Sequence, residues 1–97
     1  MNKANIGERL KALRDERQLT MDMLVEDINT KYGETINKSM LSRWETNTND
    51  PSLHLATVLA DYYNVSLDYL LSLTDVKTPV RLLTYAKKMT EKIGDKP

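Results

Sequence analysis

Residues 37–46 separate cleanly into an apolar and a polar side when they are placed on a helix. At 100° per residue, Met40, Leu41 and Trp44 fall within one arc of about 100°. The opposite arc, about 140° wide, holds Lys38, Ser39, Ser42 and Arg43. Asn37 precedes the segment, and its side chain can accept a hydrogen bond from a free N–H of the first turn. The sequence therefore predicts a short helix with one buried face.

The polar face of this helix is open to two interpretations. Arginine and lysine donate to guanine O6 and N7, and serine bonds several base edges, so the face suits the floor of a DNA major groove. A solvated face on an ordinary surface helix has the same composition. The choice between the two depends on the rest of the chain.

Composition narrows the class of protein. The 97 residues are enough for one domain with a short appendage. There is no cysteine and a single histidine, His54, so we expect no metal site and no cofactor. No apolar run approaches membrane-spanning length and no signal peptide opens the chain, so we expect a cytoplasmic protein without a membrane partner.

Charge is distributed unevenly along the chain. The 14 basic and 14 acidic residues cancel, but the ends are basic and the middle is acidic. Phosphate neutralisation supplies most non-specific affinity for DNA, so a neutral domain should bind random DNA weakly. Any DNA binding would depend on a few local contacts.

Capping residues and apolar periodicity divide the chain into helices, and no strand is indicated. Each expected helix follows a side chain that can cap its first turn. The expected helices cover 6–17, 21–32, 38–46, 53–63 and a segment starting after residue 66, with the caps Asn5, Thr20, Asn37, Ser52 and Ser66. Gly33 and Asn64 are expected to end two of them in the left-handed conformation.

The last part of the chain predicts a sixth helix. Pro79 can occupy its first turn, and an apolar stripe follows at helical spacing, formed by Leu82, Ala86, Met89 and Ile93. We therefore divide the chain into a domain at 1–73 and, at 74–97, a linker with an amphipathic helix. The stripe could fold back on the domain, pair with a partner subunit, or form part of a linker to another module, and the basic residues of the segment could instead touch DNA. We favour dimerisation, because a two-fold axis suits binding to a symmetric site.

The second and third helices, joined by a short link, form a helix-turn-helix, in which the later helix enters the major groove. Four segments then resemble the Cro/CI-type (XRE) family of bacterial and phage transcriptional regulators. They are Ile6-Gly7-Glu8-Arg9-Leu10-Lys11-Ala12-Leu13-Arg14, Leu41-Ser42-Arg43-Trp44-Glu45, Asp50-Pro51-Ser52 and Asn64-Val65-Ser66-Leu67-Asp68-Tyr69-Leu70-Leu71. The resemblance covers about residues 6–73 and implies an all-α, five-helix, lambda-repressor-like domain. It also implies a repressor that binds a double-stranded DNA operator as a homodimer.

The resemblance implies roles for individual residues. Base contacts would come from Lys38, Ser39, Ser42 and Arg43. Contacts to the DNA backbone would come from Thr20, Asn37, Asn47, Thr48 and Asn49. The loop at 48–50 could donate both main-chain N–H and hydroxyl bonds to phosphates. Arg14 and Glu45 would form an ion pair that fixes the angle between the first and third helices.

The sequence departs from the family pattern in three places. Met21 replaces a glutamine that usually contacts phosphate, and Val25 replaces an alanine that allows close helix packing. About six extra residues lie between Leu24 and Glu45. We assign them to residues 29–36, where they could tilt the third helix or bring Lys31 and Tyr32 toward the DNA backbone.

Other functions are less well supported. His54 has no second ligand nearby in the sequence, and the carboxylates of the second helix resemble a solvated face rather than an acid–base site. Ser39 and Ser42 have no base placed to activate them, so no enzyme is expected. Two alternatives stay open. One is an antitoxin-type autoregulator that also holds a toxin through the sixth helix; the other is a protein-interaction module that has lost DNA binding.

Overall fold

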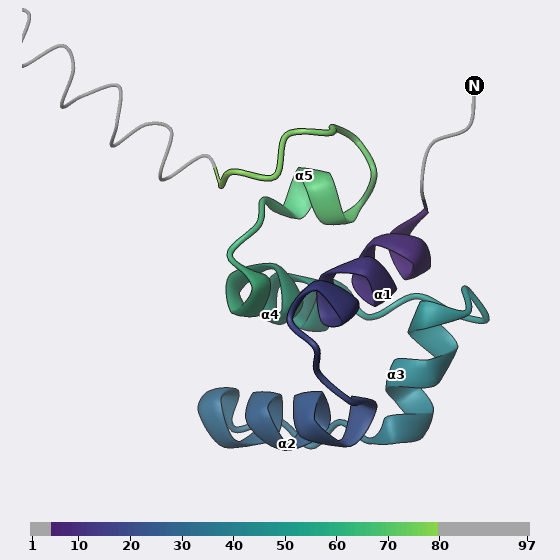
Figure 1. Ribbon diagram of the computed structural model, residues 1–97, viewed down its shortest axis with the longest axis vertical. Coiled ribbons are helices and arrows are strands. Elements are labelled where there is room, and N and C mark those ends of the chain that lie inside the picture. Colours follow the sequence, from purple (N-terminus) through teal and green to yellow (C-terminus); the bar gives the residue numbers. More distant parts are fainter. Residues whose placement is uncertain (1–4, 80–97) are drawn as a thin grey trace, which may run out of the picture.

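The computed structural model describes residues 5–79, and within that range the protein is all-helical with no strand (Figure 1). The helices are α1 (Ile6–Glu16), α2 (Met21–Tyr32), α3 (Lys38–Glu45), α4 (Leu53–Tyr63) and α5 (Leu67–Leu70). The fold class expected from the sequence is confirmed. The predicted sixth helix, with Leu82, Ala86, Met89 and Ile93, lies outside the described residues.

All five helices begin where the capping residues predict. Each cap side chain accepts a hydrogen bond from the backbone N–H three residues later, as Asn5 does from Glu8 at 2.9 Å. Gly33 and Asn64 take the left-handed conformation after α2 and α4, with φ of 66° and 54°. Helices α1 and α3 end one residue earlier than expected.

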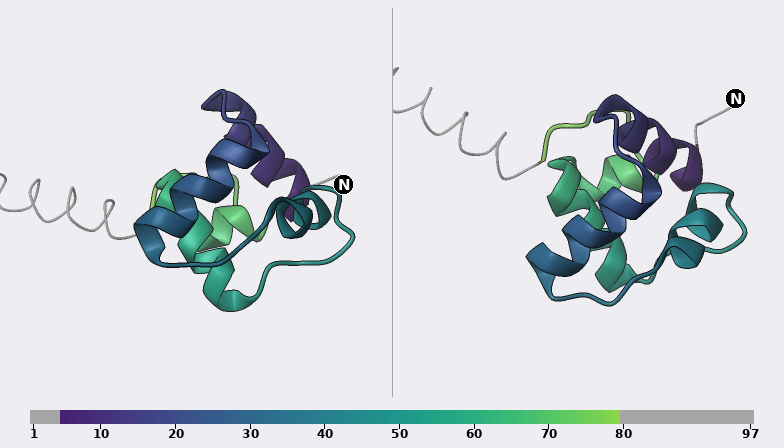
Figure 2. Two further views of the ribbon diagram at one scale, coloured as in Figure 1. Left: turned by 90° about the horizontal axis from the view of Figure 1, so that it is seen from below. Right: turned by 60° about the horizontal axis from the view of Figure 1, so that its bottom comes forward.

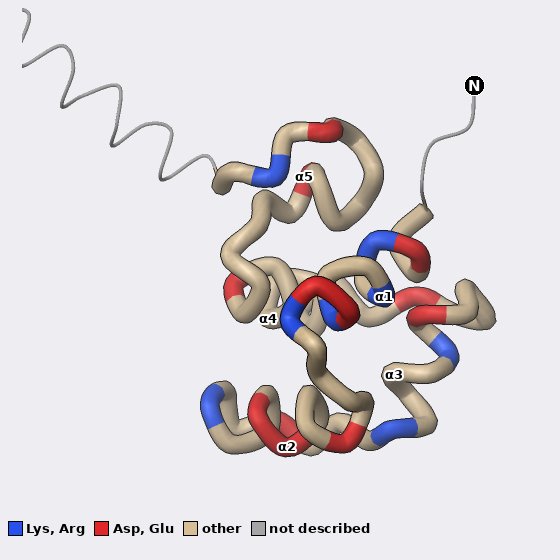
Figure 3. The backbone as a smooth tube through the Cα atoms, viewed as in Figure 1, with Lys and Arg blue, Asp and Glu red and all other residues tan. Residues whose placement is uncertain are grey.

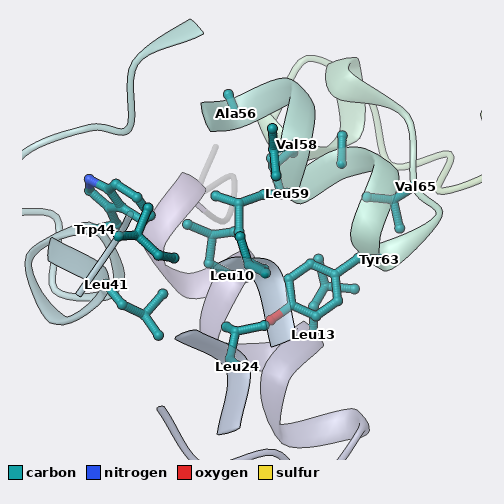
Figure 4. Close-up of a cluster of buried hydrophobic side chains, with 14 residues drawn as sticks. Leu10, Leu13, Leu24, Leu41, Trp44, Ala56, Val58, Leu59, Tyr63 and Val65 are labelled. Carbon is teal, nitrogen blue, oxygen red and sulfur yellow. The ribbon is translucent and has the colours of Figure 1, made fainter. Parts of the chain in front are cut away.

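The core joins all five helices around a few large apolar side chains (Figure 4). Its most deeply buried members are Leu10, Leu24, Ile28, Leu41, Leu59 and Leu70. Truncating such a leucine to alanine costs about 2–5 kcal/mol, so each helix is held by the others. Trp44 also packs in this cluster, which agrees with its expected place on the apolar face of α3.

The link between α2 and α3 turns back along α2 instead of leading away from it. In Figure 1, α2 lies across the bottom of the domain and α3 stands at the end where α2 begins, and the left view of Figure 2 shows the returning segment beside α2. The side chain of Asn29 fixes this segment, because it donates to the carbonyl of Ile36 and accepts from its N–H, both at 2.9 Å. Ile36 itself is buried.

The extra residues of the link therefore extend α2 and form the return. The Tyr32 hydroxyl donates to Asp61 at 2.8 Å, and the Lys31 ammonium lies 5.4 Å from the centre of the Tyr62 ring. Both partners belong to α4. The structure thus directs Lys31 and Tyr32 toward α4, at the end of α2 far from α3, and not toward the face formed by α3 (Figure 1).

The segment after α5 packs against the domain. The Arg9 guanidinium, on a buried side chain, donates to the carbonyl of Thr74 and to the carboxylate of Asp75, both at 2.6 Å. The N–H of Ser66 donates to the carbonyl of Lys77 at 2.7 Å. Residues 74–77, which the sequence assigns to a linker, are tied to α1 and to the cap of α5.

Candidate nucleic-acid interface

The two faces of α3 differ in exposure as the helical projection predicts. Lys38, Ser39 and Arg43 are exposed and Ser42 is half-buried, whereas Leu41 and Trp44 are buried. Between these outer-face side chains a long hydrogen bond, 3.4 Å, runs from Arg43 Nη2 to Ser39 Oγ. The four predicted base-contacting side chains therefore lie together on one accessible surface.

An ion pair fixes the C-terminal end of α3 to α1. Arg14 Nε donates to Glu45 Oε2 at 2.7 Å, and Arg14 Nη2 donates to Oε1 at 2.9 Å. A third donor, Nη1, reaches the carbonyl of Leu19 between α1 and α2 at 2.8 Å. The Glu45 side chain is only 2% exposed. The hydrogen bonds to Glu45 raise the pKa of Arg14 above the usual arginine value.

A second junction, between the start of α1 and the end of α3, was not predicted from the sequence. A Cβ atom on Gly7 would lie 2.6 Å from the carbonyl oxygen of Trp44 and 2.7 Å from that of Glu45, so only glycine fits there. The N–H of Gly7 donates to Asn47 Oδ1 at 3.0 Å, and Asn47 Nδ2 donates to Asn5 Oδ1 at 2.8 Å. A glycine inside a helical pattern costs about 1 kcal/mol relative to alanine, and this was the available signal of a packing role.

The loop after α3 uses its main-chain donors within the domain. The N–H groups of Thr48 and Asn49 donate to the carbonyl of Arg43 at 2.9 and 3.4 Å, and the N–H of Asn47 donates to that of Trp44 at 3.2 Å. These bonds cap the end of α3. The N–H groups of Asn47, Thr48 and Asn49 are therefore engaged within the domain, and so is the side chain of Asn47. The Thr48 hydroxyl lies 3.0 Å from that of Thr46, which itself donates to the carbonyl of Ser42 at 2.9 Å, so the Thr48 proton is directed to Thr46. The exposed side chain of Asn49 is the remaining candidate.

The N-termini of α2 and α3 lie next to each other. Asp22 Oδ2, in the first turn of α2, is 3.9 Å from Lys38 Nζ at the start of α3. The caps of these helices, Thr20 and Asn37, accept bonds from Met23 and Met40 through their side-chain oxygens. Capping uses only acceptors, so the hydroxyl proton of Thr20 and the NH2 group of Asn37 are donors that capping does not consume. Both residues are exposed.

Charge around α3 is mixed. Figure 3 shows basic positions on α3 beside an α2 that carries mainly acidic residues. Elsewhere, exposed His54 is 2.6 Å from Glu34 through Nε2 and Oε1. Within residues 5–79 no group of three potential metal-binding side chains occurs, and no helix there is long and apolar enough to cross a membrane.

The helix-turn-helix region of the chain matches a known protein family. A family model described as a helix-turn-helix domain matches residues 7–76, which include all the residues of the outer face of α3 and both junctions with α1. A protein of Bacillus subtilis (strain 168), named as an uncharacterized HTH-type transcriptional regulator YobD, is 39% identical over 72 residues. The aligned region is 74% of this chain and 59% of that relative, so the chain spans less than two thirds of the relative's length.

Proposed function

This chain belongs to the Cro/CI-type (XRE) family of helix-turn-helix transcriptional regulators, and we propose that it binds a specific double-stranded DNA sequence through α3. The proposed activity is regulation of transcription, with repression as its direction and no catalytic step. One observation carries the proposal. The outer face of α3 presents only donors and hydroxyls, while its inner face is fixed to α1 by bonded, buried groups.

In the proposed complex α3 enters the major groove. Lys38 and Arg43 would donate to guanine O6 and N7, and Ser39 and Ser42 would bond neighbouring base edges. A helix reads bases reproducibly only when its angle to the rest of the domain is held, which is the role of Arg14 with Glu45. The inner face of α3 would thus position the helix, and its outer face would recognise the DNA.

Contacts to phosphate would set the register on the duplex without reading its sequence. We propose the side-chain donors of Thr20 and Asn37 on one side of α3, and of Asn49 on the other. The Thr48 hydroxyl would have to exchange its 3.0 Å bond to Thr46 for a bond to phosphate. Asn47 would act indirectly, since its amide holds the loop against α1. These contacts are few and mostly uncharged, so non-specific binding should be weak.

We further propose that the protein binds as a homodimer to a dyad-symmetric operator, with the stripe at Leu82, Ala86, Met89 and Ile93 joining the two copies. Replacing Met89 or Ile93 with aspartate should then shift the sedimentation mass to that of a monomer. Lys88→Asp, which lies off the stripe, is the matched control and should leave the mass of the dimer. An unchanged mass in the stripe variants would refute this mode of dimerisation.

The proposal is tested by selecting bound fragments from a random double-stranded DNA pool at about 0.15 M salt, near physiological ionic strength. A dyad-symmetric consensus with half-sites about one helical turn apart is the expected result. A pool that stays flat even at low salt would contradict the DNA-binding function. It would direct the search to protein partners of the last helix.

A further inference from the structure

The contact between Asp22 and Lys38 joins the two helices of the helix-turn-helix at the proposed DNA surface. Their charged atoms are 3.9 Å apart, with side-chain exposures of 78% and 64%. Figure 3 shows the acidic start of α2 directly beside the basic start of α3. Asp22 thus forms an ion pair with one of the four side chains proposed to contact bases.

This pair contributes little to folding. Exposed ion pairs are worth about 0–1 kcal/mol, because both ions stay hydrated and both side chains lose freedom. In the first turn of α2, Asp22 also interacts favourably with the helix dipole, but any acidic residue in that turn would do so. Stability therefore does not account for the placement of Asp22 against Lys38.

The Asp22 carboxylate has different effects on a Lys38 contact to phosphate and on a Lys38 contact to a base. A lysine bound to phosphate brings the neighbouring Asp22 carboxylate close to the negative backbone, where the two charges repel. A lysine bound to guanine places its ammonium on neutral acceptors in the groove, and one of its three donors can still face Asp22. Asp22 thus penalises the contact that is independent of sequence more than the contact that reads it.

We propose that Asp22 is a specificity-determining residue that orients Lys38 toward base edges and lowers affinity for random DNA. This inference rests on the proposed function of α3 as the base-reading helix. It also gives a role to the uncharged neighbours of Asp22, since Met21 and Met23 add no positive charge to the first turn of α2. The Asp22 carboxylate then limits the attraction of Lys38 to phosphate.

The test compares Asp22→Asn with Asp68→Asn. Both aspartates are exposed and stand two residues after a hydroxyl cap, Thr20 for α2 and Ser66 for α5, so the two changes are matched in charge and helix position. Asp22→Asn should raise affinity for a random duplex about two- to fivefold, as expected for an exposed charge pair. It should also steepen the salt dependence by about 0.9 units, equivalent to one added phosphate contact. Asp68→Asn should change neither value.

Two further measurements separate orientation of Lys38 from general repulsion. Asp22→Asn should weaken the preference at the base pair read by Lys38 in pool selection and leave the other positions unchanged. In a Lys38→Ala background, Asp22→Asn should lose most of its effect on random-duplex affinity, because the effect acts through the lysine. The same effect in both backgrounds would overturn the orienting role.

The failure of this inference is distinct from the failure of the proposed function. A wild-type protein that selects no sequence would refute the function. A wild-type protein that selects a clear consensus, with Asp22→Asn behaving as Asp68→Asn does, would refute only the role of Asp22. Folding of each variant is checked by its thermal midpoint, which should stay near that of the wild type because both residues are exposed.

Discussion

The inner and outer faces of α3 differ in burial and in how tightly their side chains are bonded. On the inner face, Glu45 is almost fully buried and accepts two hydrogen bonds from Arg14, each below 3.0 Å. On the outer face, Arg43 and Ser39 share a long 3.4 Å hydrogen bond, and Lys38 forms an exposed 3.9 Å ion pair with Asp22. The helix itself is therefore fixed to α1, while the side chains proposed to read DNA remain available to a ligand.

The largest effect on stability is expected from Arg14→Leu. This change leaves the Glu45 carboxylate buried without its partner, which costs about 3–5 kcal/mol for a buried pair. Denaturant unfolding measures the loss. Lys11→Leu, at an exposed position of the same helix, is the control and should change stability by less than about 0.5 kcal/mol. Equal stability of the two variants would show that the ion pair does not fix the inner face of α3.

Gly7→Ala should be the next most damaging change. In an open helix, glycine to alanine stabilises by about 1 kcal/mol. Here the new Cβ would press on two main-chain carbonyls of α3, so we expect a loss of about 1–3 kcal/mol in thermal or chemical unfolding. Gly33→Ala meets no atom within 4 Å and should cost about 1 kcal/mol from its left-handed backbone alone. A stabilised Gly7→Ala variant would show that α1 and α3 are not in close contact.

Asn29→Ala tests the link that leads into the N-terminal end of α3. It removes both hydrogen bonds to Ile36, and we expect a loss of about 1–2 kcal/mol in unfolding free energy. Thr30→Ala, at the next and exposed position, serves as the control. If both variants were equally stable, the return of the chain along α2 would not depend on Asn29.

The smallest effect on stability belongs to the outer face. Arg43→Ala removes an exposed side chain and should change unfolding free energy by less than about 0.5 kcal/mol. The same variant should weaken specific DNA binding by about 1–3 kcal/mol. A combined unfolding and binding titration distinguishes this result from that of Arg14→Leu, in which we expect the unfolding free energy and the binding to fall together.

The helices could be predicted because their signals are local. Asn5, Thr20 and Asn37 cap the residues directly after them, and the apolar spacing within each segment decides which side is buried. The family resemblance supplied the pairing of Arg14 with Glu45, which the structure contains.

The contacts that the sequence did not reveal join residues of two different helices, or of a helix and a link or loop. Gly7 with Asn47, Asn29 with Ile36, and Asp22 with Lys38 each depend on how the elements pack, and no local pattern encodes that. The loop after α3 shows the same limit. Its composition suggests free donors, but the N–H groups of Asn47, Thr48 and Asn49 donate to carbonyls at the end of the helix.

The central claim, that the outer face of α3 reads base sequence, is tested most directly by repeating the pool selection with Arg43→Ala beside the wild type. We expect the wild type to select a dyad-symmetric consensus. The variant should lose the preference at one base pair in each half-site and keep the preferences at the other positions. An identical consensus for both proteins would contradict the claim and move base recognition away from this face.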